Sequence, residues 1–389
     1  MSESETGAES ARDQLSSADT SALRQQLEAQ IEGDVRFDAV YRGMHATDAS
    51  VYQIMPLGVV MPKTRQDVVC TVRLCHQFGA SITARGGGTS QAGQAIGAGV
   101  QLDFSRHMNR VLELDLDNRR VRVEPGIVLD ELNDQLKPHG LQLPLDLSTS
   151  NRATIGGMLA NNSAGTRSII YGKTIDFVEE LSAVLADGSV VDMRPLSGPE
   201  VAARCAQRDL EGACYRIVQQ LAAEHRDEIQ RRYPRILRRV GGYNLDDFVA
   251  PASFNLSRML VGSEGTLGLT VAATLRLEPL PVARALCTVQ FEDVLEALSA
   301  TPLILEHSPS ALELIDRFIL DTTKGRTRFE PLRDFIEGDP GAVLVVEFFG
   351  DHLEELPPRI DALADSLRQA GLGHHLHRAL EPAAQDRIW

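Results

Sequence analysis

The chain has 389 residues, of which 43% are hydrophobic and 24% charged, and its formal net charge is −15. This is the composition of a globular protein long enough for two domains. The negative charge argues against a nucleic-acid surface and against binding to anionic membranes. No apolar run reaches membrane-spanning length, and the polar stretch Met1–Thr20 lacks the apolar core of a secretory signal.

The cysteines set a further limit. None of them forms a Cys-x-x-Cys pair, so their spacing indicates neither a zinc site nor an iron–sulfur site. Unpaired, scattered thiols fit a reducing, cytoplasmic compartment. They are Cys70, Cys75, Cys205, Cys214 and Cys287.

The N-terminal half begins with a predicted disordered leader over Met1–Thr20, followed by a short charged helix over 21–34. A strand over 58–61, a helix capped by Thr64 and a second strand over 81–83 then form a β-α-β unit. Further strands are predicted over 100–104, 111–116 and 120–123, and a helix over 128–136.

The rest of the chain changes character twice. Asp187-Gly188 predicts a hairpin within 184–191, because this pair suits the positive φ angles of a tight turn. A helical insertion follows Ser197. After a strand over 269–277, a small α+β layer is predicted, with elements over 286–291, 292–306, 312–315, 342–349, 353–371 and 374–380.

The stretch Ala84–Gly93 carries the most information. Its three adjacent glycines have no Cβ atoms, so the backbone can close on a ligand and its N–H groups can converge. Arg85 precedes the glycines, and the hydroxyls of Thr89 and Ser90 follow them. This set suits an anion such as a pyrophosphate. The alternative is a flexible glycine loop without a ligand.

Two known nucleotide motifs fail on this stretch. The dinucleotide pattern Gly-x-Gly-x-x-Gly needs its third glycine where Gln91 stands. A nucleoside-triphosphate loop needs Lys followed by Ser or Thr where Gln94-Ala95 stands.

Two more loops of small polar residues lie downstream. In Ser148–Gly165 a helix is predicted to begin near Thr154 and to direct its first N–H groups at a phosphate. The other loop is Gly262–Gly268. The alternatives are a polar loop that caps a helix and a tight strand connection.

These three loops, in this order and spacing, resemble the FAD-binding fold of the vanillyl-alcohol oxidase and p-cresol methylhydroxylase superfamily, and within it the FAD-linked D-2-hydroxyacid dehydrogenases. The resemblance implies an α+β fold: a two-subdomain FAD-binding domain of p-cresol methylhydroxylase type, then an incomplete ferredoxin-like substrate domain. The implied FAD contacts are Arg85, Gly86, Gly87, Gly88, Thr89, Ser90, Thr154, Gly156, Gly157, Asn161, Ser163, Gly165, Tyr171, Gly172, Glu264, Gly265 and Gly268.

The implied domain limits are 1–34 for the leader and short helix, 35–280 for the FAD-binding domain with a helical insertion over about 197–240, and 281–389 for the substrate domain. Segments around Thr47–Tyr52 and Gly242–Leu245 resemble a bacterial branch fused to a C-terminal iron–sulfur domain, for which D-2-hydroxyglutarate is a typical substrate. The family's metal-binding His-x-x-Gly-Asp-Gly-Asn motif does not occur, so we expect an N-terminal part of such a protein, without metal or iron–sulfur sites.

The resemblance further implies noncovalent FAD, because Thr89-Ser90 stands where the family places a tethering histidine. Candidates for contacts to a substrate carboxylate are Arg317, Lys324 and Arg328, with Glu313 and Asp316 nearby. His375 and His377 would share one face of a strand, which permits a metal pair, but a solvated strand is the favoured interpretation.

The expected function is oxidation of a D-2-hydroxy acid, D-2-hydroxyglutarate or D-lactate, by hydride transfer to flavin, with electrons passed to an acceptor protein or module other than oxygen. Two alternatives stay open: a flavin-binding fragment inactive alone, and a flavin-containing transferase similar to alkyl-dihydroxyacetonephosphate synthase.

Overall fold

The computed structural model describes residues 15–389, so the predicted leader falls largely outside the described residues. Helix α2 (Ser17–Gln30) begins before the position expected for it. The Ser16 side chain accepts a hydrogen bond from the Asp19 backbone N–H, which caps the helix, and Leu23 and Leu27 are fully buried. Capping and burial together fix this helix.

The described chain forms two compact units. The first contains the residues up to Ala164 together with Lys173–Glu278, and the second contains Gly165–Gly172 and Pro279–Trp389.

The first unit begins with a four-stranded sheet in the order β1-β2-β4-β3, in which β2 and β3 both pair with β4 in parallel. Its strands are β1 (Asp34–Arg36), β2 (Gly58–Met61), β3 (Ile82–Arg85) and β4 (Val100–Asp103). Helix α4 (Arg65–Phe78) connects β2 to β3, and a capping box between Thr64 and Asp67 fixes its start, as the sequence predicts.

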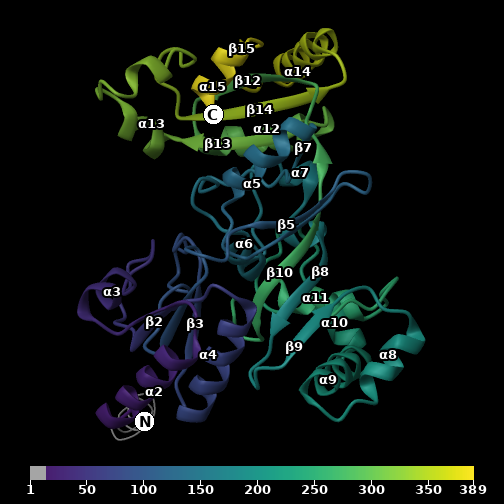
Figure 1. Ribbon diagram of the computed structural model, residues 1–389. Helices are drawn as coiled ribbons and strands as arrows, with labels where there is room; N and C mark the ends of the chain where they lie inside the picture. The colour runs from purple at the N-terminus through teal and green to yellow at the C-terminus, as the bar shows by residue number, and fades with distance from the viewer. Residues whose placement is uncertain (1–14) are drawn as a thin grey trace, which may run out of the picture. The chain divides into compact units, whose positions relative to one another are not determined.

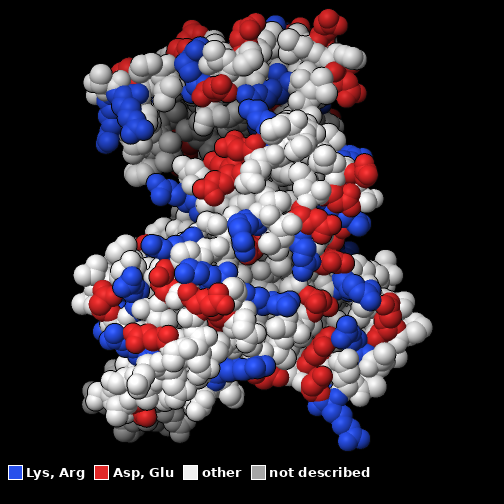
Figure 2. Space-filling model, viewed as in Figure 1, with Lys and Arg blue, Asp and Glu red and all other residues white. Residues whose placement is uncertain are grey.

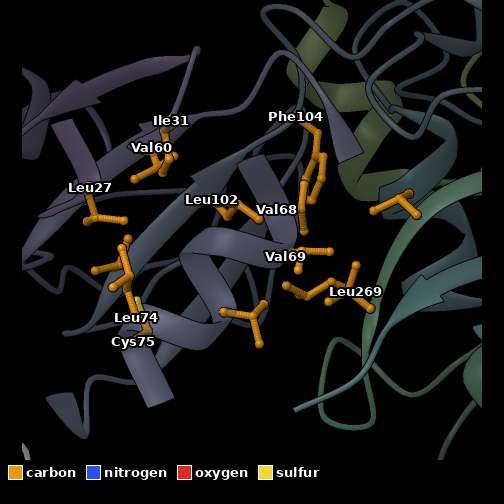
Figure 3. Close-up of a cluster of buried hydrophobic side chains, with 14 of the residues drawn as sticks. Leu27, Ile31, Val60, Val68, Val69, Leu74, Cys75, Leu102, Phe104 and Leu269 are labelled. Carbon is orange, nitrogen blue, oxygen red and sulfur yellow. The ribbon is translucent and has the colours of Figure 1, made fainter. Parts of the chain in front are cut away.

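A buried apolar cluster holds this layer together (Figure 3). Leu27 and Ile31 come from the end of α2, Val68 and Cys75 from α4, and Leu102 from β4. All five are at most 9% exposed, so helix and sheet exclude water from the space between them.

A second, antiparallel sheet of five strands completes the unit, in the order β5-β6-β10-β8-β9. The predicted hairpin is confirmed, because β8 and β9 pair antiparallel around Asp187-Gly188. Its strands are β5 (Val111–Asp115), β6 (Arg120–Val123), β8 (Val178–Val184), β9 (Val190–Met193) and β10 (Leu269–Arg276).

The remaining helices of the first unit lie in the segments that connect its strands. Three of them, α8, α9 and α10, pack against one another in the predicted insertion (Figure 1). The helices and remaining short elements are α3 (Ala39–Met44), α5 (Leu129–Leu136), β7 (Leu141–Gln142), α6 (Ile155–Asn161), α8 (Gly198–Cys205), α9 (Leu210–Glu224), α10 (Arg226–Arg232) and α11 (Ser257–Leu260). Strand β11 (Glu278–Pro279) lies where the chain passes into the second unit.

The second unit is an antiparallel sheet in the order β13-β14-β12-β15, with helices α12 and α14 packed on one face (Figure 1). Two short helices, α13 and α15, were not anticipated. Its elements are α7 (Ser168–Tyr171), β12 (Ala283–Phe291), α12 (Val294–Glu306), β13 (Ala311–Asp316), α13 (Arg317–Thr323), β14 (Ala342–Gly350), α14 (Leu356–Ala370), β15 (His375–Ala379) and α15 (Pro382–Ile388).

The segment Gly165–Gly172 is fastened into the second unit by a buried ion pair. Arg167 binds both carboxylate oxygens of Glu347 on β14, at 2.7 and 3.0 Å, and its guanidinium lies 5.3 Å from the centre of the Phe349 ring. The Glu347 side chain is fully buried. A buried carboxylate needs such a two-point partner to offset the loss of its hydration.

Among residues 15–389, no helix combines the length and the hydropathy needed to cross a membrane. On the face drawn in Figure 2, acidic and basic side chains are interspersed rather than separated into regions of one sign.

We predict that Arg167→Ala lowers the free energy of unfolding by about 3 kcal/mol, because it leaves the Glu347 carboxylate buried without its partner. Urea denaturation measures this change. Arg368→Ala, which removes an exposed pair with Asp365 on α14, is the control and should cost less than about 1 kcal/mol. Equal effects of the two substitutions would contradict the role assigned to Arg167.

Candidate functional site

The glycine loop leaves the end of β3, where Arg85 lies opposite Asp103 of β4. Each of the next three residues needs to be glycine. A Cβ on Gly86 would lie 2.0 Å from Thr154 Oγ1, and one on Gly87 would lie 2.1 Å from the Arg152 carbonyl oxygen. Gly88 has a φ of +65°, and its Cβ would lie 2.6 Å from the Arg85 guanidinium. The loop can therefore follow this path only without side chains.

The backbone N–H groups of this loop have no hydrogen-bond partner in the described part of the chain. Within residues 15–389, no N–H from Gly86 to Ser90 donates to an acceptor of the chain. Unpaired backbone donors on consecutive residues form a concave site for anionic oxygens. This is the chemistry that the sequence predicts for the loop.

A cavity of about 450 Å³ in the first unit lies against this loop, and a smaller one of about 70 Å³ shares several of its lining residues. Most of the predicted FAD contacts line one or both: Arg85, Gly86, Gly87, Gly88, Thr89, Ser90, Thr154, Gly156, Gly157, Asn161, Ser163, Glu264, Gly265 and Gly268. The structure thus brings all three loops to one place.

Three predicted contacts lie elsewhere. Gly165, Tyr171 and Gly172 belong to the second unit, where the Tyr171 ring centre lies 6.5 Å from that of Phe349. For them an FAD contact stays a prediction.

One prediction about the second loop is wrong. Helix α6 does begin at Ile155 with Thr154 as its cap, but its first N–H groups are not directed at a ligand. Ile155 donates to the Ile127 carbonyl at 2.9 Å, Gly156 to the Pro125 carbonyl at 2.7 Å, and Gly157 to Thr154 Oγ1 at 3.3 Å. The neighbouring residues satisfy these donors, which leaves the N–H groups of the glycine loop as candidates for binding an anion.

The third loop is tied to the C-terminal end of α6. Gly262 donates to the Leu159 carbonyl at 2.9 Å, and Glu264 donates to the Ala160 carbonyl at 3.0 Å. The Gln94 amide donates to Glu264 Oε1 at 3.3 Å, which joins the first loop to the third. Glu264 has a φ of +51°, a conformation that residues other than glycine adopt uncommonly.

The guanidinium of Arg85 donates hydrogen bonds to backbone carbonyls of the protein. Its two terminal nitrogens donate to the carbonyls of Ala95, at 3.1 Å, and Thr47, at 2.9 Å. Burial lowers the pKa of this guanidinium, and the nearby carboxylates of Asp103 and Asp48 oppose that change. Arg85 therefore holds the loop closed and lends it positive charge.

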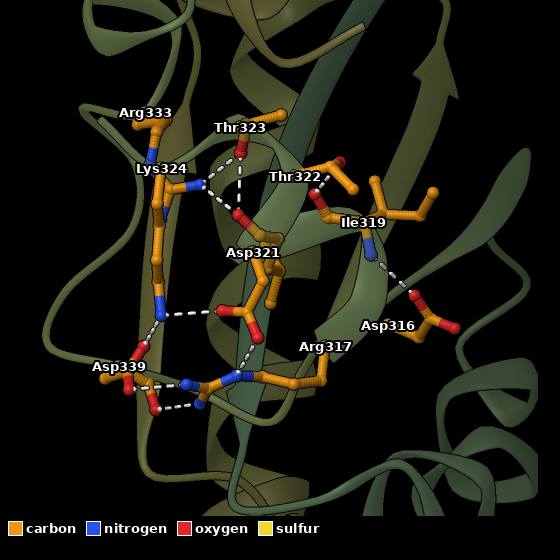
Figure 4. A network of polar contacts seen from close by, with 10 residues as sticks. Asp316, Arg317, Ile319, Asp321, Thr322, Thr323, Lys324, Arg333 and Asp339 are labelled. Atoms are coloured by element: carbon orange, nitrogen blue, oxygen red, sulfur yellow. Dashed lines mark hydrogen bonds and ion pairs between the residues drawn. The ribbon is translucent and has the colours of Figure 1, made fainter. Parts of the chain in front are cut away.

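The candidate substrate contacts in the second unit are paired with acids. Arg317 binds Asp321 at 3.0 Å and Asp339 at 2.8 Å, and Lys324 binds the same two carboxylates (Figure 4). Hydrogen bonds to these acids raise the pKa of both cations. Two positive and two negative charges cancel, so the network offers little net attraction to a carboxylate.

The remaining candidates of this region have separate positions. Arg328 lies 5.8 Å from the centre of the neighbouring Phe329 ring. Glu313 and Asp316 lie on β13, and Asp316 caps α13 by accepting the Ile319 N–H at 2.9 Å.

The histidines of β15 have acidic and strand neighbours, and a metal pair of His375 with His377 is not tested by the contacts of these two residues. His375 Nδ1 lies 2.8 Å from Glu337 Oε2, and no group of three or more metal-ligating side chains exists in the described part of the chain.

Several residues around the cavity were not predicted. Gln94, Ala95 and Leu147–Thr149 line it, and His45 and Asp48 support the loop from behind. The sequence held one signal for this support: Thr47-Asp48-Ala49-Ser50 has the composition of an Asx turn, and Ser50 does donate its N–H to Asp48 at 2.9 Å.

Comparison with known families bears on what this cavity holds. An FAD binding domain model matches residues 56–194, and the model of the C-terminal domain of FAD linked oxidases matches residues 280–389. The chain belongs to the FAD-linked oxidases. The resemblance found in the three loops is therefore confirmed, and so is the α+β fold class.

Similar proteins add detail about the family. A D-2-hydroxyglutarate dehydrogenase of Pantoea ananatis is 36% identical over 88% of this chain and 35% of its own length. A D-2-hydroxyglutarate dehydrogenase of Escherichia coli is 35% identical over 90% of this chain and 35% of its own length. A probable mitochondrial D-lactate dehydrogenase of Danio rerio is 27% identical over 96% of this chain and 65% of its own length. The chain thus spans about a third of the length of the D-2-hydroxyglutarate dehydrogenases it matches.

Solved structures share the fold at lower identity. An alkyldihydroxyacetonephosphate synthase superimposes with a TM-score of 0.67 at 19% identity, over 96% of this chain and 63% of its own. A p-cresol methylhydroxylase with bound substrate superimposes with a TM-score of 0.64 at 15% identity. The match covers 94% of this chain and 67% of the methylhydroxylase chain.

We predict that Gly87→Ala weakens FAD binding by roughly ten- to a hundredfold, because the added Cβ would overlap the Arg152 carbonyl and push the loop open. Quenching of FAD fluorescence on titration with protein measures the affinity. Gly198→Ala adds a Cβ with no atom within 4 Å and is the matched control. Binding by Gly87→Ala within twofold of the unsubstituted chain would refute the tight fit at this residue.

Proposed function

We propose that the first unit binds FAD noncovalently and that the chain serves in the oxidation of a D-2-hydroxy acid. The observation that carries the proposal is the run of unpaired N–H groups from Gly86 to Ser90 on a cavity formed by three loops. Backbone donors at this position suit the pyrophosphate of a dinucleotide, and the matched family supplies the identity of the dinucleotide.

Noncovalent attachment is supported by the cavity lining. The described residues that line the 450 Å³ cavity include no histidine, cysteine or tyrosine, the side chains with a nucleophilic atom suited to a bond with the flavin. Thr89 and Ser90 offer hydroxyls, which hydrogen-bond to phosphate oxygens.

The family's chemistry requires three tasks of the protein: holding the dinucleotide, orienting the hydroxy acid and excluding water. When bound, FAD supplies a two-electron acceptor for the hydrogen on the carbon that bears the substrate hydroxyl. The glycine loop performs the first task through its N–H groups. Polar side chains of the second loop, such as Asn161 and Ser163, satisfy further oxygens.

For the second task, Arg317 and Lys324 remain our proposed contacts to the substrate carboxylate, with Arg328 in the same segment. Binding would replace Asp321 or Asp339 by the substrate carboxylate at the two cations. Because one carboxylate replaces another at the two cations, the exchange gains little electrostatic energy. Tight binding of the substrate therefore requires contacts from additional groups. D-2-hydroxyglutarate and D-lactate are the substrate class we propose, since the similar dehydrogenases are named for them. An electron-acceptor protein or module, and not molecular oxygen, would reoxidise the flavin.

The balanced ion network of Figure 4 also favours a narrower alternative, in which this chain binds FAD but needs further residues to act on a hydroxy acid. The two possibilities differ in one measurable property, the reduction of bound flavin by substrate.

We predict that the purified chain, loaded with FAD and kept free of oxygen, loses its visible flavin absorbance when D-2-hydroxyglutarate is added. L-2-hydroxyglutarate is the control and should leave the spectrum unchanged. Acid precipitation should release all flavin into the supernatant. Bound flavin that no D-2-hydroxy acid bleaches would contradict the dehydrogenase proposal and favour the binding module, and a chain that retains no FAD would contradict both.

A further inference from the structure

The chain at the end of α10 and after it is basic, whereas the protein as a whole is acidic. The segment 229–243, called the basic segment below, contains no aspartate or glutamate, and the formal net charge of the chain is −15. The five arginines of this segment are Arg231, Arg232, Arg235, Arg238 and Arg239. Such a local concentration of positive charge attracts acidic partners and raises the rate at which they meet the protein.

Apolar side chains of the same segment are exposed to solvent. Ile236 is 64% exposed, Leu237 51%, Val240 40% and Tyr243 42%. Single exposed apolar residues are ordinary, but a local concentration of them marks an interaction site. Arginine and tyrosine around apolar side chains are the residues in which protein interfaces are enriched. The basic segment therefore has the composition of a docking surface.

The exposed arginines outnumber the acids that pair with them. Arg231 and Arg232 both bind Glu228 on α10, and all three side chains are exposed. Arg235 is exposed too, and its side chain has no ion pair or hydrogen bond within residues 15–389. This part of the surface thus keeps positive charge that an approaching partner can meet.

Contacts at its two ends support the basic segment. Arg239 binds both carboxylate oxygens of Asp246, at 2.8 and 2.7 Å, and its guanidinium lies 4.9 Å from the centre of the Tyr233 ring. The Tyr233 hydroxyl donates to the Tyr243 carbonyl at 2.9 Å. These contacts restrain the loop between the two tyrosines, so it loses less entropy when a partner binds to it.

A cavity of about 710 Å³ in the first unit lies beside the basic segment, and none of its lining residues lines the FAD cavity. Four cations and three acids line it. Each acid has a cationic partner: Lys173 with Asp176 at 3.9 Å, Arg239 with Asp246 at 2.7 Å and Arg258 with Asp247 at 2.7 Å. The fourth cation is Arg235, whose guanidinium can bind a carboxylate of a partner.

The basic segment is joined to the third loop of the FAD cavity. The Tyr243 hydroxyl lies 2.9 Å from Thr266 Oγ1, and Thr266 directly follows Gly265, which lines that cavity. The next residue, Asn244, is 3% exposed, and its amide donates to the Val261 carbonyl at 2.8 Å, directly before the loop. A partner docked on the basic segment would therefore lie beside the proposed FAD site.

We propose that the basic segment and the cavity beside it are the docking surface for an acidic electron-acceptor protein or module. The inference rests on the proposed function, in which a hydroxy acid reduces the flavin and an acceptor must reoxidise it. Reoxidation of one FADH2 delivers two electrons to two one-electron acceptors and two protons to the solvent. The partner places carboxylates at Arg235 and apolar side chains at Ile236 and Leu237.

Charge and apolar exposure together favour this occupant. The overall negative charge disfavours a nucleic acid. On the face drawn in Figure 2, acidic side chains are interspersed with basic ones, so a second copy of the chain presents no concentrated acidic surface on that face. A small organic anion would satisfy Arg235 but leave Ile236 and Leu237 exposed. An acidic protein contacts both kinds of group.

The test uses soluble cytochrome b5, an acidic haem protein, as the acceptor. The FAD-loaded chain is reduced by light with EDTA in the absence of oxygen, and haem reduction is followed by stopped-flow absorbance. The rate should fall at least about tenfold when sodium chloride is raised from about 10 mM to about 500 mM, because salt screens the attraction. The net charge of −15 alone predicts the opposite sign, since it repels an acidic protein.

Substitution of Arg235 locates the effect. Arg235→Glu should slow reduction of cytochrome b5 roughly tenfold at low salt, and Arg235→Lys, which keeps the charge, should retain the rate. Reduction of cytochrome c, a basic haem protein, should not be slowed by either substitution. Arg65→Glu, at an exposed position on α4, is the matched control and should leave the cytochrome b5 rate within about twofold. A rate that rises with salt, or equal effects of Arg235→Glu and Arg65→Glu, would overturn the proposal.

A second measurement does not depend on FAD. Calorimetric titration of the ligand-free chain with cytochrome b5 at low salt should show binding that Arg235→Glu weakens roughly tenfold. Binding of this kind by a chain that retains no FAD would refute the proposed cofactor site and leave the docking surface standing. Absence of binding would overturn the docking surface even if FAD is held. A dimer that Arg235→Glu dissociates, seen by sedimentation, would assign the surface to a second copy and also overturn the proposal.

Discussion

The site depends on the close approach of the glycine loop to the second loop. Gly87 lies so near the Arg152 carbonyl, and Gly86 so near the Thr154 side chain, that a Cβ atom at either position would overlap its neighbour. This contact brings the first loop against the second and leaves a row of N–H groups without partners in the described chain. The proposed contact with the pyrophosphate depends on those donors, because the first N–H groups of α6 already donate to the carbonyls of Ile127 and Pro125 and to Thr154 Oγ1.

Such a loop has little stability of its own. Its glycines contribute no side-chain contacts and lose more conformational entropy on ordering than other residues. The structure compensates with supports outside the loop: Arg85 and the segment that follows His45 on one side, and the contact of Gln94 with Glu264 on the other. Contacts that hold such a loop in place lower the entropy that is lost when a ligand binds to it.

The two units differ in the polar groups that they offer to a ligand. In the first, the cavity, the donors and the supports all lie on residues of one compact unit. In the second, the cations that could hold a carboxylate are neutralised by Asp321 and Asp339, and the buried charge of Glu347 is matched by Arg167. The chain spans about a third of the length of the D-2-hydroxyglutarate dehydrogenases it matches.

The sequence predicted what depends on local chemistry. Thr64 with Asp67 marks a helix start and Asp187-Gly188 marks a hairpin, since each signal lies within a few residues. It could not predict partners that are distant along the chain. The capture of the α6 donors by carbonyls near Pro125, and the pairing of Arg317 with Asp339, depend on tertiary contacts that no local pattern records.

We propose that the glycine loop recognises the pyrophosphate of FAD through its backbone. The most direct measurement compares how tightly ADP and adenosine compete with FAD for the purified chain in a fluorescence titration, because these two competitors differ only in the pyrophosphate. ADP should bind at least about a hundredfold more tightly than adenosine, the equivalent of two charged hydrogen bonds. Equal affinities for the two competitors would contradict this proposal.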